Sequence, residues 1–487
     1  MRTQSGGDSL IVTMASRSTV RRSRSARSAR RALRWEYLRE YAAGALWVLP
    51  ALAAGIAVLG GLAMSQIEVE PGTLLDRIAF QGTADDARTL LISVSSTVVT
   101  VIALVLGLTV VALQLSSTAF SPRLLRNFLR DRATQVVLSV FIATFVYSAS
   151  GLFTVGLSAG SRTEEFPRLA ISGSILLLFA SLGMVVYFAD HLMHSIQIDA
   201  INKRVVDNTR RVLREMHVET VGGLAPRAPE WAVPLRARKS GYVQTVHPEL
   251  LLPVASQAGV TICLRPRIGQ HVITGTTIGW VWAPTADDPR PDPEPFEQAV
   301  DIDVRIGFER TLEQDVAFGI RQQLDIACRA LSAAINDPYT AVQAINHLSV
   351  VSSELAVRPL GADILTDSAG RGRVVVPGNT FRDYLFFVCG VVGRYGAHEV
   401  TVMTALSHLV RACTEVLPPG SDRLNPLHQA AGQILVDAKR AMVRPSDVES
   451  LRRTTESLLG RIAAKQAADG SPTQRTTRSQ TPAKTEP

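Results

Sequence analysis

The chain has 487 residues, of which 46% are hydrophobic, and it carries a formal net charge of +8. This composition is too apolar for an ordinary soluble protein of that size, and the hydrophobic excess lies before residue 193. A basic chain often binds nucleic acid, but here the basic residues crowd beside apolar runs, which favours a membrane protein without a nucleic-acid partner.

Residues 1–36 have the composition of a disordered basic tail. The basic region is about forty residues long and the next apolar run is long enough to span a membrane, so the pattern does not fit a cleavable signal peptide. We expect this tail to touch anionic lipid.

Four apolar runs follow, and each is close to the ~20 residues that a helix needs to cross the hydrocarbon core. They lack the alternation of a transmembrane barrel, which excludes that fold. The runs therefore predict a four-span membrane domain over 37–195, with spans at about 42–64, 89–115, 133–157 and 169–190.

The charges between the spans indicate the orientation. Arginines crowd before the first span and in the 116–132 loop, whereas the 65–88 loop is rich in Asp and Glu. Loops with an excess of Lys and Arg stay in the cytoplasm. We therefore predict a multi-pass protein with both termini in the cytoplasm.

The second predicted span carries small and polar residues at spacings of three to four. They are Ser93, Ser96, Thr97, Thr100, Gly107, Gln114 and Ser117. Such a stripe is typical of a water-filled path, but it equally serves close packing between helices. Because it is costly to leave facing lipid, we expect a cyclic homo-oligomer that buries it.

A second pattern follows this span, where four arginines come after Pro122. They are Arg123, Arg126, Arg130 and Arg132. They either form the cytoplasmic mouth of a pore or lie among lipid phosphates on a short interfacial helix. No acidic or basic residue lies well inside the four spans, so an ion-coupled pump is less favoured than a passive pore or a structural role.

The remainder predicts a cytoplasmic α+β part. We expect an amphipathic connecting helix over 194–217, a small β-rich module over 235–284, a helical domain over 300–466 and a disordered tail over 467–487. The glycine spacing of the module resembles the barrel-sandwich fold of biotinyl and lipoyl carriers. It has no lysine at a hairpin tip, so carrier function is not expected.

Two helix starts are predicted within the helical domain. Thr311–Gln314 has the form of a capping box, and Asp337 followed by Pro338 is typical of an N-cap and first turn. Three further helices are expected, over 381–416, 423–442 and 446–465.

Candidate catalytic and metal-binding residues have simpler explanations. A solvated helix face with caps accounts for the acid–base candidates, which are Glu309, Arg310, Asp315, Arg321, Asp325 and Asp337. His191 and His194 lack a third metal ligand. Wide spacing predicts reduced core thiols for the cysteines, which are Cys263, Cys328, Cys389 and Cys413. We predict no metal, no cofactor and no recognisable enzyme class.

Three segments together resemble a bacterial predicted membrane protein family of unknown function (DUF2254). They are residues 110–148, SGYVQ (240–244) and 309–348, the last of which contains ALSAAINDPYTA (330–341). The resemblance singles out Asn336, Asp337, Pro338 and Thr340 and implies a bacterial inner-membrane protein with a cytoplasmic C-terminal half. It brings no established activity.

The sequence therefore favours an oligomeric ion channel or passive pore that the cytoplasmic domain gates, with the lipid bilayer and further copies of the chain as partners. The alternatives are a membrane-anchored scaffold or signalling adapter without transport activity, and a membrane-bound enzyme.

Overall fold

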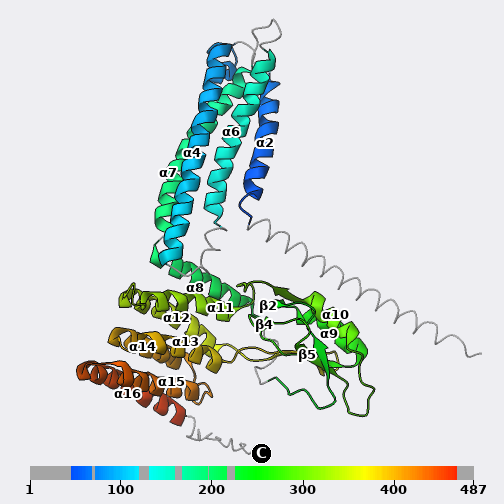
Figure 1. Cartoon of the computed structure of the whole chain (residues 1–487), viewed down its shortest axis with the longest axis vertical. Coiled ribbons are helices and arrows are strands. Elements are labelled where there is room, and N and C mark those ends of the chain that lie inside the picture. Colours follow the sequence, from blue (N-terminus) through cyan, green and yellow to red (C-terminus); the bar gives the residue numbers. More distant parts are fainter. Residues whose placement is uncertain are drawn as a thin grey trace, which may run out of the picture. The chain divides into compact units, whose positions relative to one another are not determined.

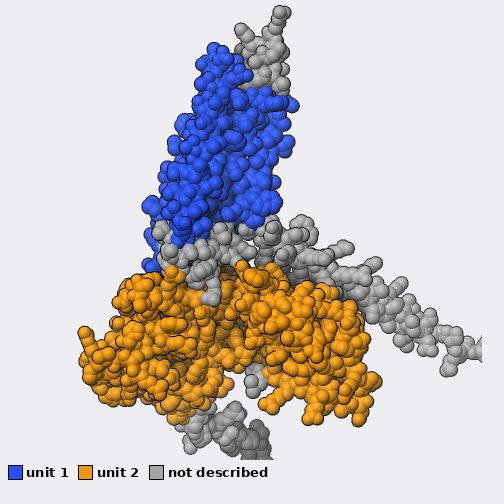
Figure 2. Space-filling view, viewed as in Figure 1, with its two compact units in different colours: residues 1–201 blue, residues 202–487 orange. Residues whose placement is uncertain are grey.

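The computed structural model describes residues 45–67, 72–119, 131–158, 167–195, 197–216 and 225–468. The predicted tail 1–36 lies outside the described residues, as do nearly all of the tail 467–487 and the arginines Arg123, Arg126 and Arg130. The chain divides into two compact units (Figure 2), unit 1 over Met1–Ile201 and unit 2 over Asn202–Pro487.

Unit 1 is a bundle of long helices (Figure 1). Four of them are long and apolar enough to cross a membrane, in agreement with the four predicted spans. They are α2 (Val48–Ser65), α4 (Ala84–Ala119), α6 (Arg132–Ser158) and α7 (Arg168–Ser195). The short helix α3 (Leu74–Ile78) precedes α4, and the Asp76 carboxylate accepts a hydrogen bond of 3.1 Å from Arg168 at the start of α7.

Helix α6 is the centre of this bundle, because it packs against α2, α4 and α7. In its apolar window 44% of the residues are buried, against 17–22% in the other three spans. Phe141 of α6 is fully buried among valines of α4 and Phe188 of α7. The Thr144 and Ser181 hydroxyls, 2.8 Å apart, connect α6 to α7 inside the bundle.

Two glycines make room for side chains of α6, Gly173 for the buried Tyr147 and Gly61 for Ser150. A Cβ atom added at Gly173 of α7 would lie 2.3 Å from the Tyr147 hydroxyl oxygen. One added at Gly61 of α2 would lie 2.9 Å from Ser150 Oγ. Small residues therefore set how closely α2 and α7 approach α6, as is usual between membrane helices.

Unit 2 contains two β-sheets. The five-stranded sheet has the order β1 (Val233–Arg236), β5 (Thr277–Trp282), β3 (Thr261–Leu264), β8 (Gly372–Val376) and β7 (Asp363–Thr366). The three-stranded sheet has the order β4 (His271–Val272), β2 (Gly241–Val246) and β6 (Val304–Gly307). Helix α9 (Pro248–Ala258) packs on β8, and α10 (Glu294–Asp303) packs on α9.

The β-structure extends well beyond the predicted module 235–284. Strands β6, β7 and β8 lie inside the region 300–466 that was expected to be helical. Strand β8 pairs in parallel with β3, with Ile262 opposite Val374. The missed strands are four or five residues long, too short to show a clear period of two. Strand β7 pairs with its neighbour β8 as a local hairpin, whereas β6 and β8 also pair with β2 and β3, which lie much earlier in the chain.

Six helices complete unit 2. They are α11 (Val316–Ala330), α12 (Pro338–Val357), α13 (Phe381–Gly396), α14 (Val400–Val416), α15 (Leu424–Ala441) and α16 (Pro445–Ala467). The single helix predicted over 381–416 is two helices, separated at Ala397–Glu399. The predicted capping box at Thr311–Gln314 is wrong, because Asp315 caps α11. The predicted N-cap at Asp337 is confirmed.

Helix α8 (Ile198–Glu215) is the predicted connecting helix and leads from unit 1 into unit 2. It begins separately from α7, which ends at Ser195. Asn202 Oδ1 accepts a hydrogen bond of 2.7 Å from Gln323 Nε2 of α11, and both residues are buried. A Cβ atom added at Gly319 of α11 would lie 2.1 Å from Thr209 Oγ1, so the two helices approach closely there.

This close approach predicts that Gly319→Ala destabilises unit 2. Thr209 is buried and β-branched, so it cannot rotate away, and the added methyl group should lower the free energy of unfolding by about 1–3 kcal/mol. Thermal unfolding of the full chain in detergent micelles, followed by tryptophan fluorescence, measures the change.

Gly432→Ala in α15 is the matched control, since a Cβ atom there meets nothing within 4 Å. It should leave stability unchanged or raise it by about 0.4–1 kcal/mol. Equal effects of the two substitutions would contradict the close contact between α8 and α11.

Candidate functional site

Helix α4 turns its polar residues away from its own bundle. Six predicted pore-lining residues are exposed on it, namely Ser93, Ser96, Thr97, Thr100, Gly107 and Gln114. The buried face of the same helix is apolar and consists of Ala87, Leu91, Val94, Val98, Val105 and Ala112. Ser117 also belongs to α4, but its side chain lies outside the described residues.

Two apolar residues share the exposed polar face of α4. Leu104 and Val111 are 57% and 50% exposed. Most positions of α4 outside its buried face are exposed, and seven of them follow alternating spacings of four and three, namely Ser93, Thr97, Thr100, Leu104, Gly107, Val111 and Gln114. This is the spacing of the contact positions in a coiled coil, and we call these seven residues the α4 seam.

Two hydroxyls of the seam, those of Ser93 and Thr100, find partners within their own helix. Ser93 Oγ donates to the Thr89 carbonyl at 2.8 Å, and Thr100 Oγ1 donates to the Ser96 carbonyl at 3.1 Å. A hydroxyl bonded in this way can face lipid without an unpaired donor. The polarity of the seam is therefore compatible with lipid, with water and with another helix.

A polar cluster that the sequence analysis missed lies where α6 begins and α7 ends. Asp131 Oδ2 lies 2.5 Å from His191 Nε2 and 3.1 Å from Thr134 Oγ1. Ser195 Oγ is 3.1 Å from the same His191 nitrogen. A Ser–His–Asp relay uses both ring nitrogens of the histidine, so this cluster is not arranged for nucleophilic catalysis.

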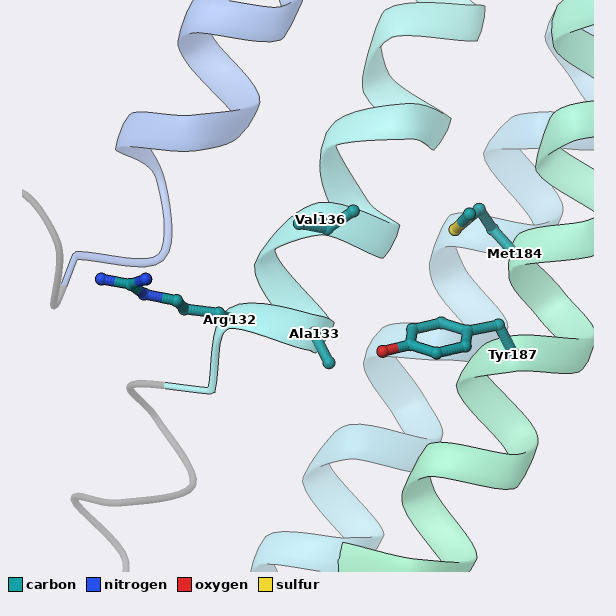
Figure 3. Close-up of a pocket in the computed structure, with 5 residues that line it drawn as sticks. All are labelled: Arg132, Ala133, Val136, Met184 and Tyr187. Atoms are coloured by element: carbon teal, nitrogen blue, oxygen red, sulfur yellow. The ribbon is translucent and has the colours of Figure 1, made fainter. Parts of the chain in front are cut away.

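Next to this cluster, a groove of about 330 Å³ lies between α6 and α7 (Figure 3). It is lined by Arg132, Ala133, Val136, Met184 and Tyr187. The Tyr187 ring reaches from α7 toward Ala133, whereas the Arg132 side chain points away from α7. Val136 and Tyr187 are 41% and 46% exposed, so the groove opens on the outside of the bundle.

The two histidines considered for metal binding have separate surroundings. His191 contacts Asp131 and stacks on Tyr187, with ring centroids 6.0 Å apart, whereas His194 Nδ1 lies 2.8 Å from the Asp190 carbonyl oxygen. Across the residues described, no group of three or more His, Cys, Asp or Glu side chains is placed to hold a metal ion.

The acid–base candidates of unit 2 fall into separate structural roles. Arg310 pairs with Asp315 at 2.7 Å, and Asp315 also caps α11 by accepting from the Phe318 amide. Arg321 pairs with Asp325 at 2.7 Å, and Asp325 lies nearly three turns beyond Asp315, about 15 Å away along the helix axis. Glu309 presents its carbonyl oxygen to Gln244 Nε2.

The family motif at 330–341 builds the turn between α11 and α12. Asn336 has a positive φ of 50°, a conformation that asparagine tolerates better than most residues. The Asp337 carboxylate accepts from the Thr340 amide at 3.1 Å and from the Thr340 hydroxyl at 2.6 Å, and these bonds lower the pKa of Asp337. Pro338 occupies the first turn of α12.

The four cysteines are free thiols in unit 2. Cys263, Cys389 and Cys413 are buried, and Cys328 is half-buried. Burial raises the pKa of Cys263 to about 11 and that of Cys389 to about 12. Thiols in this state are weak nucleophiles.

The chain matches the family described as "Predicted membrane protein (DUF2254)" over residues 43–412. It belongs to this family. Two mycobacterial relatives, "Uncharacterized protein Rv1290c" of Mycobacterium tuberculosis and "Uncharacterized protein Mb1321c" of Mycobacterium bovis, are each 41% identical over 450 residues. Each alignment covers 88% of this chain and 86% of the relative. No solved structure matches the chain.

Family membership and the four candidate spans together make this a membrane protein of a family whose function is unknown. The family match includes α4, the groove between α6 and α7, and the turn at 330–341.

We expect Arg310→Gln to destabilise unit 2, because Asp315 is 3% exposed and would lose its cation. The free energy of unfolding should fall by about 1–3 kcal/mol near neutral pH. Burial raises the pKa of Asp315 and Arg310 opposes that rise. Removing Arg310 raises the folded-state pKa further, so the deficit should grow as pH rises above the unfolded pKa of about 4.

Denaturation at about pH 4 and about pH 7 tests both the size and the sign of this effect. Arg452→Gln is the control, because Arg452 pairs with Glu449 and Glu456 on the exposed surface of α16, where solvent screens ion pairs, and it should leave stability nearly unchanged. A deficit of Arg310→Gln that shrinks with rising pH would contradict the assignment.

Proposed function

We propose that this protein is a homo-oligomeric ion channel or passive pore in the bacterial inner membrane, with both termini in the cytoplasm and with unit 2 as the regulatory part. The observation that carries the proposal is the exposure of the α4 seam. In a single chain these residues lie outside the bundle, at the spacing with which one helix contacts a copy of itself.

The composition of the seam favours helix association over contact with lipid alone. Serine, threonine and glycine at regular spacing let membrane helices approach closely and form hydrogen bonds. Around a symmetry axis, one copy of the seam from each chain would line a central path. Ser93, Thr97 and Thr100 would offer hydroxyl oxygens to hydrated ions over one part of this path.

Leu104 and Val111 give the same path an apolar section. Rings of such side chains close a pore to water and ions by dewetting, so small changes in their separation open or close it. Unit 2 is joined to the last span through α8, which supplies a covalent route from a regulatory unit to the membrane unit. The arginines at 123–132 would then attract anions or repel cations at the mouth.

Oligomerisation is tested by disulfide crosslinking in native membranes. Thr97→Cys and Gly107→Cys should each give a crosslinked dimer on mild oxidation, because equivalent seam positions meet in a parallel contact. Leu176→Cys is the control, since Leu176 of α7 is 71% exposed but does not belong to the seam. Only monomer from both seam variants would contradict the proposed assembly.

Transport is tested by planar-bilayer recording on the purified oligomer. Leu104→Trp should lower the conductance at least about tenfold by filling the path, whereas Leu176→Trp should leave it unchanged. Ion selectivity should shift when Arg123 and Arg126 become glutamine. If a folded oligomer shows no conductance for any ion at any voltage, the membrane-anchored scaffold is favoured instead. The arginines would then be explained by contact with lipid phosphates.

A further inference from the structure

The family-motif turn between α11 and α12 presents an apolar tip to solvent. Residues 333–336 are all exposed, and the side chains of Ile335 and Tyr339 are 44% and 73% exposed. The segment 330–336 contains no charged residue. Large apolar side chains that gather on one exposed surface mark a site of interaction, so this tip is a candidate for one.

The backbone of the turn fixes the direction in which the tip projects. Asn336 has the left-handed conformation, and the Asp337 carboxylate accepts hydrogen bonds from the Thr340 amide and hydroxyl. Such local bonds hold the chain on both sides of the tip. They explain the shape of the turn, but they do not explain why Ile335 and Tyr339 are apolar and exposed.

The end of α13 adds a second tyrosine to the tip. A Cβ atom added at Gly396 would lie 3.1 Å from Leu331 Cδ1, which places the last turn of α13 beside the end of α11. Tyr395 is 51% exposed there, and Arg394 next to it is also exposed. The C-terminal dipole of α13 accounts for a cation at this position. Exposed tyrosine beside arginine is, in addition, the composition of an anchor at a membrane interface.

The tip lies toward the edge of unit 2 at which the chain arrives from the last span. Two residues separate the end of α7 from the start of α8. Asn202 pairs with Gln323, and Thr209, later on α8, lies against Gly319, earlier on α11. Helix α8 therefore runs antiparallel to α11 (Figure 1), and its first turn points toward the end of α11 that carries the tip.

We propose that this tip, formed by Ile335, Tyr339 and Tyr395, inserts into the bilayer interface at the end of the last span and holds unit 2 on the membrane surface. Insertion removes three exposed side chains from water, and tyrosine suits the boundary between headgroups and acyl chains. Arg394 then contacts lipid phosphates. The bilayer is favoured over another protein because α8 ties this edge of unit 2 to a span, which keeps lipid at high effective concentration. The proposal uses no seam residue and does not depend on the pore.

Fluorescence quenching by spin-labelled lipid tests the insertion, with the full chain in nanodiscs of phosphatidylglycerol and phosphatidylcholine. A nitrobenzoxadiazole probe on Tyr339→Cys should be quenched at least about twofold by lipid with a nitroxide at the top of its acyl chain. Val357→Cys is the matched control, because Val357 is 57% exposed at the opposite end of the same helix, about 27 Å away, and should be quenched little. The chain without an added cysteine gives the background from its own thiols.

Removal of the apolar side chains gives a complementary test, read from a probe on Tyr395→Cys. Ile335→Ser with Tyr339→Ser should reduce its quenching by about half or more, whereas Val350→Ser with Val357→Ser, on the same helix but outside the tip, should not. All four side chains are exposed, so the fold is retained, which unchanged thermal unfolding verifies. Absence of quenching at position 339, or equal quenching at 339 and 357, would overturn the proposal. A disulfide between two copies at Ile335→Cys would assign the tip to a second chain instead.

Discussion

A polar group left unpaired in the hydrocarbon core of a bilayer costs several kcal/mol, and the structure of unit 1 depends on that constraint. Its hydroxyls are largely satisfied within their own helices. Ser139 Oγ donates to the Gln135 carbonyl at 2.6 Å, and Thr144 Oγ1 donates to the Val140 carbonyl at 2.8 Å. Each helix can then be placed by shape, through glycines, as Gly173 beside Tyr147 and Gly61 beside Ser150 illustrate.

The same constraint limits what can be concluded from the polar face of α4. Because the Ser93 and Thr100 hydroxyls bond backward to the backbone, polarity at these positions does not require a partner for this face. The spacing of the seam residues is more informative than their polarity, because residues separated alternately by four and three positions lie along one side of a helix and can contact a second helix. The groove between α6 and α7 differs from this face of α4. Its lining is largely apolar, with Arg132 as the charged residue, and it contains no residue of α4. Unit 1 thus has two outer surfaces of different chemistry.

Unit 2 depends on contacts between distant parts of the chain. The parallel pairing of β3 with β8 connects the predicted β-module to a segment more than a hundred residues later, so the two expected domains form one unit. Helix α8 joins this unit through a buried amide pair and a glycine contact on α11. The turn at 330–341 closes α11 onto α12 through Asp337, which gives the family motif a structural role.

The sequence by itself determined the four spans, the amphipathic helix α8 and the cap at Asp337, because span length, helical periodicity and capping are local properties of the chain. It placed the polar residues of α4 on one stripe, but it could not show which side of the helix the bundle buries. Only the tertiary structure decided the short strands β6, β7 and β8, the Asp131–His191 contact and the groove. The pairings of β6 with β2 and of β8 with β3, the Asp131–His191 contact and the groove join residues far apart in sequence, and the β7–β8 hairpin is too short to give a clear local pattern.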